Sequence, residues 1–536
     1  MPTKPISSAW RLLPLLTIAG LMIACDATNV EDSAGAATPA DAGRQMYRDG
    51  ILPSGEPMTA IVAGDVPVLG TQFSCESCHG RSGMGAAEGA YIVPPIAGRF
   101  LFAPSPQPAR PAYTQESLAH LLRNGMTPGG RDLGELMPLY KLTDEEVAAM
   151  TAYLAKLSFG ISPGVDDKVI RFAMVITDDV SADEREAVLA VLNTFVEEKN
   201  RNTRLESERW DRGNTPASRL PTIHRDWVLE EWALSGPAKT WNEQLERRYR
   251  DAPVFAMLSG LSDRSWGPIS DFCERNEIPC LFPGTDLTDA AEGDFYTLYF
   301  SRGLELEADL IASHLAESPV ADVVQVYCAD GAAQAATHLR AKLEKLETAV
   351  SDIEFDCDAA SPLEDVPDHL ATAEDATFIL WLNQEEVAAI GDRMPAGRVY
   401  FSSTLLGSEL DAPFSSLAGP AFLAHPFRLP GQFDPAFARF EVWAKTRGIE
   451  LTSPRRQSEA FFACLAIKDA VAHIGRYFIR DFVLDTLDHA QSIVAYLSFY
   501  PRPTLGPQQR FVNKGGYVLP IVDGQPDPTE AAWILP

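Results

Sequence analysis

The sequence has no apolar run that approaches 18 residues, and it has few basic residues for its length. A membrane-spanning helix needs about 20 mainly apolar residues in a row, so a polytopic membrane protein is excluded. The chain has 45 Lys and Arg against 74 Asp and Glu, which gives a net charge of −29. Nucleic-acid binding depends on a basic surface, so this charge argues against DNA or RNA as a partner.

Several motifs of catalysis and metal binding are missing as well. The sequence has no Gly-rich phosphate loop, no nucleophile elbow, and no second Cys-x-x-Cys to complete a zinc site. With 536 residues, of which 46% are hydrophobic, the chain is long enough for two or three globular domains. We therefore expect a multidomain protein and look for its function in the short motifs that are present.

The first 24 residues have the features of a bacterial export signal. Lys4 and Arg11 precede an apolar stretch, residues 12–24, that is too short to span a bilayer. This stretch ends in Leu21-Met22-Ile23-Ala24-Cys25, which resembles a bacterial lipobox. The resemblance implies cleavage before Cys25 and acylation of that residue, with residues 25–41 as a flexible tether. The alternative is ordinary cleavage near Ala24.

Cys75-Glu76-Ser77-Cys78-His79 is a C-x-x-C-H motif, the attachment signature of c-type haem. Two thiols three positions apart lie on one face of a helical turn, where both can add to the vinyl groups of haem. A thioredoxin-like pair or half a zinc site is the alternative, but neither requires the His. The motif predicts one covalent haem c, held by Cys75 and Cys78, with His79 as an axial iron ligand.

We expect Met137 to be the second axial ligand of the iron. It lies just before residues 143–146, which form a capping box at the start of an amphipathic helix. Met126 and Met84 are rival thioethers, and His120 is a further alternative. Met84 follows the haem motif too closely to reach the opposite face of the haem easily.

Residues 42–158 resemble a class I cytochrome c. Residues 43–50 look like the opening helix of these proteins, and the order of ligand loop and final helix is the same. The insert that includes residues 52–57 is longer than in minimal cytochromes. The resemblance implies an all-α domain with low-spin iron between His79 and Met137, and a Met/His ligand pair raises the reduction potential.

A short linker, residues 159–167, precedes a different pattern. From residue 168 onward, apolar runs alternate with helical periodicity. Strands are expected at residues 169–176, 254–258, 323–327, 378–382 and 399–402, and helices at 183–200, 265–276, 332–346 and 385–393. Such alternation predicts an α/β fold in which helices cover both faces of a parallel sheet.

Residues 168–536 resemble the type I periplasmic binding proteins of the branched-chain amino-acid family. The resemblance lies in residues 255–262, 273–285, 300–302 and 326–331. It implies two doubly wound lobes that hold a small molecule between facing strand ends. Candidate hydroxyl or backbone donors to the ligand are Ser259, Ser262 and Thr285. Candidate carboxylates for an ammonium group of the ligand are Asp330 and Glu459. The alternative is that these are turn and helix-capping residues.

Eight cysteines are present. In an exported protein, the cysteines outside the lipobox and the haem motif are expected to form disulfides. A short loop would close between Cys273 and Cys280. Cys328 and Cys357 each end a predicted strand, and parallel neighbours would bring those ends within about 4.8 Å. Cys464 lies in an apolar helical stretch and is expected to be free and buried.

Together, these features predict a multidomain electron-transfer cytochrome that is exported to the bacterial periplasm and anchored to the membrane as a lipoprotein. Its binding-protein-like domain would sense a small-molecule ligand or dock a partner, and its redox partner would be a protein such as a periplasmic dehydrogenase or another cytochrome. The alternative is a solute-binding component of an ABC-type uptake system with an accessory haem. Because Met137 would close the iron, an electron carrier is expected rather than an enzyme.

Overall fold

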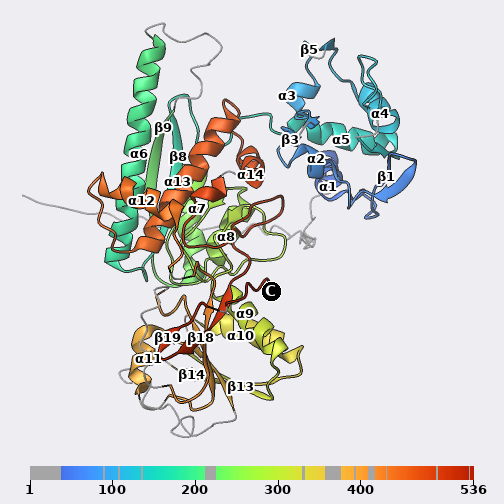
Figure 1. Cartoon of the computed structure of the whole chain (residues 1–536). Coiled ribbons are helices and arrows are strands. Elements are labelled where there is room, and N and C mark those ends of the chain that lie inside the picture. Colours follow the sequence, from blue (N-terminus) through green and yellow to red (C-terminus); the bar gives the residue numbers. More distant parts are fainter. Residues whose placement is uncertain are drawn as a thin grey trace, which may run out of the picture.

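The computed structural model shows three parts of the chain: a small N-terminal region beside a larger pair of lobes (Figure 1). We call residues 38–158 the cytochrome region, and we call the two parts of the remaining chain, each built around its own sheet, lobe 1 and lobe 2. The structure describes residues 38–88, 91–106, 109–133, 137–211, 225–328, 332–355, 376–391, 394–407, 417–429, 431–490, 493–529 and 531–536.

The helices of the cytochrome region are α1 (Pro39–Asp49), α2 (Cys75–His79), α3 (Gly98–Leu101), α4 (Gln115–Asn124) and α5 (Asp144–Lys156). The predicted capping box begins α5, since Thr143 accepts from the backbone of Glu146 and Glu146 accepts in return. Helices α1 and α5 cross at Gly43, where a Cβ would lie 2.2 Å from the carbonyl oxygen of Ala149. Only glycine permits this close crossing.

The cytochrome region also contains strands, so the expectation of an all-α domain is not confirmed. Strands β1 (Thr59–Val62), β2 (Val66–Leu69) and β7 (Leu139–Tyr140) form an antiparallel sheet. Two hairpins pair β3 (Ala86–Glu88) with β4 (Tyr91–Val93) and β5 (Ser105–Pro106) with β6 (Ala109–Arg110). The long insert before the haem motif accounts for the three-stranded sheet, because it folds into β1 and β2 and pairs with β7, the segment after Met137.

Lobe 1 is built on a five-stranded parallel sheet in the order β12-β11-β10-β8-β9. The strands are β8 (Val169–Thr177), β9 (Asp226–Leu234), β10 (Ala256–Leu258), β11 (Cys280–Leu281) and β12 (Thr297–Leu298). Its helices are α6 (Ala182–Asp211), α7 (Trp241–Asp251), α8 (Gly267–Arg275), α12 (Pro435–Lys445), α13 (Pro454–Ile474) and α14 (Arg480–Asp488), with 3-10 turns η3 (Ala238–Thr240) and η6 (Ile493–Tyr496). Fully buried Phe172, Phe255 and Phe462 lie in the core between the sheet and α13.

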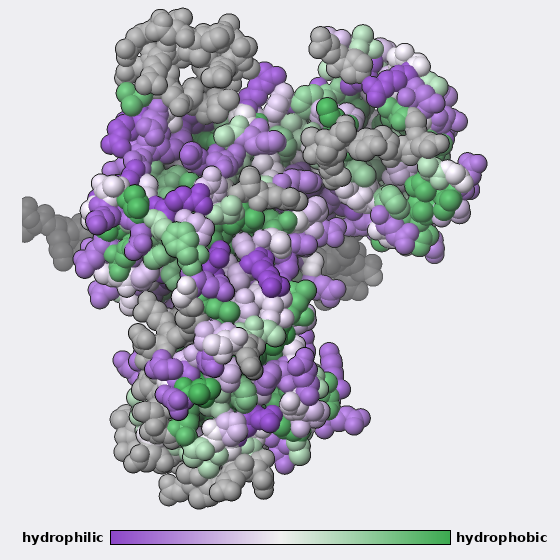
Figure 2. Space-filling model, in the orientation of Figure 1, coloured by the Kyte–Doolittle hydropathy of each residue, from purple (hydrophilic) through white to green (hydrophobic). Residues whose placement is uncertain are grey.

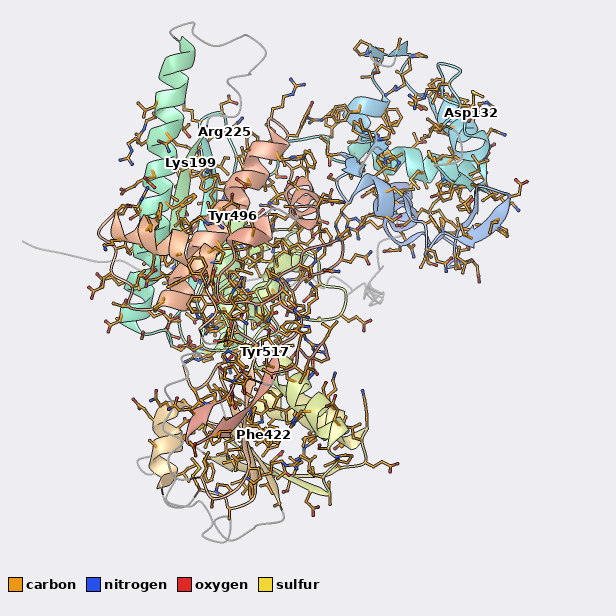
Figure 3. All side chains as sticks on the ribbon, viewed as in Figure 1. Asp132, Lys199, Arg225, Phe422, Tyr496 and Tyr517 are labelled. Atoms are coloured by element: carbon orange, nitrogen blue, oxygen red, sulfur yellow. The ribbon has the colours of Figure 1, made fainter. Side chains whose placement is uncertain are left out.

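Lobe 2 has a seven-stranded sheet in the order β14-β13-β15-β16-β17-β18-β19. The parallel strands are β13 (Asp322–Cys328), β14 (Ala349–Phe355), β15 (Thr377–Trp381), β16 (Arg398–Ser402) and β17 (Ala421–His425); β18 (Tyr517–Val522) and β19 (Gln525–Pro526) are antiparallel. Helices α9 (Leu304–Glu317), α10 (Ala333–Glu344) and α11 (Gln384–Ile390) cover the sheet. Phe422 on β17 and Tyr517 on β18 mark the two neighbouring antiparallel strands (Figure 3).

The chain passes between the lobes three times, and the three crossing segments lie side by side. The backbone N–H of Tyr299 donates to the carbonyl of Arg510 at 2.8 Å, and that of Asn513 donates to the carbonyl of Phe300 at 2.7 Å. The fully buried amide of Asn513 also donates to the carbonyl of Pro426 at 2.9 Å. Asn513 therefore ties together all three crossings, through its backbone N–H to Phe300 and its side chain to Pro426.

Candidate functional sites

Helix α2 carries the C-x-x-C-H motif in a single capped turn. Ser74 is its N-cap, and the Ser74 hydroxyl accepts from the backbone N–H of Ser77 at 3.3 Å. Cys75 is half-buried against the core of the cytochrome region, whereas Cys78 is exposed. Both are free thiols. The short helix therefore holds two unpaired thiols one turn apart, as attachment to haem requires.

The ring of His79 is oriented by a backbone carbonyl. Its side chain is buried, and Nδ1 lies 3.0 Å from the carbonyl oxygen of Pro94. With a proton on Nδ1 for this hydrogen bond, the lone pair of Nε2 is free for a metal ion. Burial lowers the pKa of His79, although the contact with Pro94 acts in the opposite direction. The ring is therefore held neutral, which is the form that ligates iron.

Met137 lies at the edge of the same core, between α4 and β7. Its half-buried side chain packs against the cluster that also receives Cys75. Met84 instead packs with Ala97 of the cytochrome region and Ile479 of lobe 1, and His120 is exposed on α4. Met126 forms a backbone bridge to Asp132. Of the alternative ligands, Met84 is thus occupied in a different contact, and Met137 remains the predicted axial ligand.

Apolar side chains from several elements surround these residues. The buried members on α4 and around it are Leu101, Tyr113, Leu118, Leu121, Leu122 and Tyr140. An apolar core that adjoins two thiols, a neutral imidazole and a thioether fits haem c, which supplies one-electron chemistry at its iron. The residues present therefore fit the group that the motif implies.

The structure brings three of the candidate ligand residues of lobe 1 to neighbouring strand ends. Ser259 and Ser262 follow β10, Thr285 follows β11, and these two strands are paired. The hydroxyl of Ser262 donates to the carbonyl of Arg264 and accepts from its N–H, and the hydroxyl of Thr285 accepts from the N–H of Leu287. Ser262 and Thr285 thus close their own turns, as the alternative interpretation expected.

Glu459 on α13 has two partners in the buried interior. It accepts from Arg456 at 3.1 Å and from the hydroxyl of Tyr500 at 2.6 Å. Arg455 and Arg456 in turn bind Asp286, at 2.7 Å and 2.5 Å. We call Asp286, Arg455, Arg456 and Glu459 the interlobe cluster, because the backbone carbonyl of Asp286 also accepts from the first residue of α9 in lobe 2. Glu459 is therefore engaged within the protein rather than exposed to an ammonium ligand.

Sequence reasoning missed Asp286, Arg455 and Arg456. Burial raises the pKa of Asp286, but the two guanidinium groups outweigh it and hold that pKa below its usual range. A pair of adjacent arginines at the start of a helix in a strongly acidic chain was the available signal. It did not identify Asp286, which is 169 residues from Arg455 in the sequence.

The predicted Cys273–Cys280 disulfide is wrong in this structure, where both residues are free and buried. The thiol of Cys273 lies 3.4 Å from the sulfur of Met257 in an apolar cluster. Burial and the neighbouring Cys280 raise the pKa of Cys273, and both residues pack as small side chains in the apolar cluster. Cys464 is free and buried, as expected.

The remaining predicted residues fall partly outside the described part of the chain. Cys328 is disulfide-bonded, and it lies opposite Phe355 in the pairing of β13 with β14. Its expected partner Cys357, the ligand candidate Asp330 and the lipidation candidate Cys25 all lie outside the described residues.

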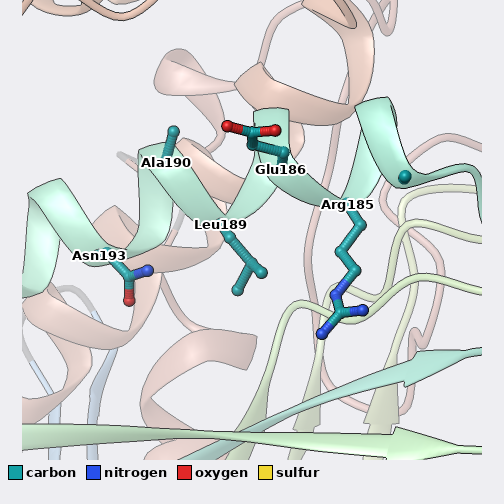
Figure 4. Close-up of a pocket in the computed structure, with 6 residues that line it drawn as sticks. Arg185, Glu186, Leu189, Ala190 and Asn193 are labelled. Carbon is teal, nitrogen blue, oxygen red and sulfur yellow. The ribbon is translucent and has the colours of Figure 1, made fainter.

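A surface pocket of about 450 Å³ runs along α6, away from these sites (Figure 4). Its lining comes from this helix alone, and includes Leu189, Ala190 and Asn193. Arg185 in this wall is already paired with Glu231 of β9. The pocket offers no set of converging polar groups, and we assign it no function.

Two features are absent from the described residues. None of their helices combines the length and the apolar character that a bilayer crossing demands. They also contain no group of three or more His, Cys, Asp and Glu side chains arranged to hold a metal ion.

About two thirds of the chain is similar to solved structures of ligand-binding and ABC transporter proteins. A leucine-binding protein from Thermotoga maritima is 13% identical, covers 68% of this chain and 99% of its own, and has a TM-score of 0.44. A branched-chain amino-acid ABC transporter protein from Thermus thermophilus with bound valine is 11% identical, with coverages of 68% and 96% and a TM-score of 0.46. A fatty acid ABC transporter substrate-binding protein from Thermomonospora curvata is 13% identical, with coverages of 70% and 94% and a TM-score of 0.43.

The cytochrome region gives a match of another kind. No protein among those with curated descriptions matches the chain. The model of the cytochrome c family, however, matches residues 70–158, a segment that contains the C-x-x-C-H motif, the apolar core and Met137. The match implies a haem c cofactor and a redox partner. Residues 70–158 are thus similar to a cytochrome c domain.

Proposed function

We propose that this protein is an electron carrier with one haem, covalently attached through Cys75 and Cys78 and ligated by His79 and Met137. The observation that carries the proposal is the geometry of α2, where two free thiols precede a buried His whose Nδ1 is held by Pro94. Haem at this site would accept and release one electron. With both axial positions filled by protein ligands, the iron would serve transfer rather than catalysis.

Replacement of the sixth ligand tests this proposal. Met137→Ala is expected to open the iron to added ligands such as imidazole and to lower the reduction potential, because a thioether ligand favours the ferrous state. Optical spectra and redox titration of the purified full chain would show both changes. Met126→Ala is the matched control, and we expect it to keep the parent spectrum. The reverse result would assign the ligand to Met126.

The redox partner is proposed to be a protein that docks on the free side of the cytochrome region. Figure 2 shows apolar side chains gathered over the β1–β2 hairpin, away from the lobes. Val66 and Leu69 there are 50% and 51% exposed, and Phe73 precedes the haem motif with 38% exposure. A periplasmic dehydrogenase or another cytochrome would place its own redox centre near exposed Cys78 from this side.

We also propose export to the bacterial periplasm and membrane attachment through a lipid on Cys25. The support is the short apolar N-terminal stretch that ends in a lipobox-like sequence. Cys25→Ser is expected to release a soluble protein that still carries haem, as measured by fractionation and haem staining. Membrane association that is unchanged in this variant would contradict the lipid anchor.

The two lobes are proposed to sense a small molecule or to dock a partner for the cytochrome. The three side-by-side crossings support motion of the lobes, whereas the interlobe cluster satisfies Glu459 from within. A solute-binding role in ABC-type uptake is the second candidate, supported by the same two-lobed arrangement. Calorimetry of the full chain against amino acids, short carboxylates and fatty acids separates the roles that need a bound solute, uptake and sensing, from docking of a partner. Tight binding of one solute favours uptake or sensing, and no binding favours docking.

A further inference from the structure

The loop that follows the axial ligand His79 lies against lobe 1 rather than against solvent. Helix α14 sits between lobe 1 and the cytochrome region (Figure 1). Asp485 on this helix is half-buried, and its carboxylate accepts from the backbone N–H of Arg81 at 3.0 Å and of Ser82 at 2.9 Å. The two amides come two and three positions after His79. Successive backbone N–H groups of this kind form a concave site for an anion, which here is a side chain from another part of the chain.

The fit around this carboxylate is close. Gly80 has φ +73°, and a Cβ at this position would lie 2.6 Å from Oδ2 of Asp485. On the opposite side, the carbonyl of Gly80 accepts from the hydroxyl of Tyr47 at 2.7 Å, and that of Ser82 accepts from the hydroxyl of Ser158 at 2.6 Å. The cytochrome region therefore holds the carbonyls of the loop, and lobe 1 holds its amides.

Further contacts fix α14 relative to the haem loop. Asp481 lies one turn before Asp485 and faces Arg48 of α1 at 3.5 Å, while it accepts from the hydroxyl of Tyr296 at 2.8 Å. The guanidinium of Arg81 stacks over the ring of Phe295 at 3.9 Å. These contacts are buried or half-buried, so solvent screens them little.

An apolar contact flanks the polar one. Met84, which follows the haem loop, packs with Ala97 and with Ile479 at the start of α14. Phe100 of the cytochrome region meets Tyr477 edge to face at 5.6 Å. The combination of buried charge pairing and apolar packing indicates a fixed interface rather than two parts on a loose tether.

We infer that Asp485 is a positioning residue of the haem site: its carboxylate fixes the loop that follows His79, and its charge contributes to the reduction potential of the iron. Lobe 1 is then a structural part of the haem site. Movement of the loop would act directly on His79, whose ring is held by Pro94 and whose main chain leads into Gly80. A half-buried negative charge close to the iron ligand favours the ferric state over the ferrous state. The inference rests on the proposed function in that haem is bound at His79.

Two variants of Asp485 separate its charge from its hydrogen bonds. Asp485→Asn keeps the shape and one acceptor but removes the charge, and Asp485→Ala removes both. Asp481→Asn is the matched control, because it removes a charge one turn away that does not touch the loop amides. Burial raises the pKa of Asp485 to about 7, so measurements at pH 8.5 keep the carboxylate ionised in the parent protein.

The first measurement is redox titration of the haem-loaded full chain. Asp485→Asn is expected to raise the ratio of ferrous to ferric protein about tenfold at a fixed potential, which for one electron is an upward shift of about 59 mV. Asp481→Asn is expected to change this ratio by much less. Equal shifts in the two variants would show a general charge effect and would overturn the positioning role, as would no shift in either variant of Asp485.

The second measurement follows the loop itself, by hydrogen exchange of the peptide that contains residues 80–84. Asp485→Ala is expected to speed exchange of the Arg81 and Ser82 amides at least tenfold, Asp485→Asn less, and Asp481→Asn least of the three, because Asp481 does not touch these amides. The same measurement in a Cys75→Ala/Cys78→Ala full chain needs no haem. Unchanged exchange in Asp485→Ala overturns the inference even when haem is bound. If a chain with Cys75 and Cys78 intact carried no haem and still showed the change in exchange, only the proposed function would be overturned.

Discussion

The haem site and the interlobe cluster use buried polar groups in opposite ways. At the haem site, His79 has one nitrogen held by Pro94 and the other free, and two thiols remain unpaired beside it. In the interlobe cluster, Glu459 and Asp286 are engaged by Arg455 and Arg456. A side chain that keeps an unused lone pair or a free thiol can bind a cofactor, whereas a side chain whose partners all lie within the protein mainly stabilises the fold. The haem site can therefore take up a cofactor, whereas the interlobe cluster has a structural role.

Removal of Asp286 is the strongest way to test the structural character of the interlobe cluster. Asp286→Ala leaves Arg455 and Arg456 buried with one carboxylate fewer, and loss of one partner of a buried ion pair costs about 3–5 kcal/mol. Urea unfolding of the full chain, followed by fluorescence, would measure the loss. If the cluster instead bound an anionic ligand, removal of Asp286 would strengthen that binding.

The control for Asp286 is an exposed ion pair in the same lobe. Arg264 and Asp178 lie 3.3 Å apart with side chains that are 46% and 40% exposed. Arg264→Ala is expected to cost less than about 1 kcal/mol, because solvent screens an exposed pair. A similar cost for both variants would contradict the view that burial makes the interlobe cluster important.

The sequence predicted the haem site because the information there is local. The C-x-x-C-H motif occupies one helical turn, so its spacing already determines which atoms lie together. The cap of α5 is equally local, with Thr143 and Glu146 three positions apart. By contrast, Asp286 and Arg455 meet only after both lobes have formed, and no spacing in the sequence reports such a contact.

The distinction between local and long-range information also explains which strands were predicted from the sequence and which were not. Apolar runs that are buried on both faces, such as β8 and β15, were expected at the right places. The edge strand β9 was missed, because its centre, Glu230-Glu231, is polar and half-buried, and β14 was missed for the same kind of reason. The strands of the cytochrome region are two to four residues long and depend on pairing with distant segments. Their presence follows from tertiary contacts rather than from periodicity.

A second prediction compares the two buried carboxylates nearest the lobe crossings. Unlike Asp286, Glu307 on α9 has no cationic partner among its contacts in the described chain: one oxygen accepts from the N–H and hydroxyl of Thr404, at 2.9 and 2.8 Å, and the other has no hydrogen bond there. Burial raises its pKa from 4.5 to about 8, although the hydrogen bonds from Thr404 and the nearby hydroxyl of Ser402 oppose the shift. The folded chain thus binds this proton more tightly than the unfolded chain.

The stabilisation from this proton is complete below about pH 4.5 and is lost as the pH rises through about pH 8. Between pH 6 and pH 7, one such group changes the free energy of unfolding by at most about 1.4 kcal/mol. The Glu307→Gln variant has no carboxyl group to titrate at this position. As the pH rises from 6 to 7, we therefore expect the free energy of unfolding of the parent, measured in urea, to fall relative to that of the variant. A difference that is constant with pH would show that Glu307 is ionised in the folded protein.

The smallest expected effect concerns Cys273, where the structure replaced a predicted disulfide by two packed thiols. Cys273→Ala removes one buried sulfur atom that contacts Met257, and we expect a cost of about 1 kcal/mol, typical of a small deletion in a core. A disulfide would behave differently, because its loss costs about 2–5 kcal/mol in small domains and a reductant would reproduce the loss. Unfolding of the parent and of Cys273→Ala, each with and without dithiothreitol, separates the two cases. The reductant also acts on Cys328 in both proteins. The decisive quantity is therefore the difference in the free energy of unfolding between parent and variant, compared with and without reductant. A difference of about 1 kcal/mol under both conditions supports packed thiols, and a difference that vanishes in reductant restores the bridge.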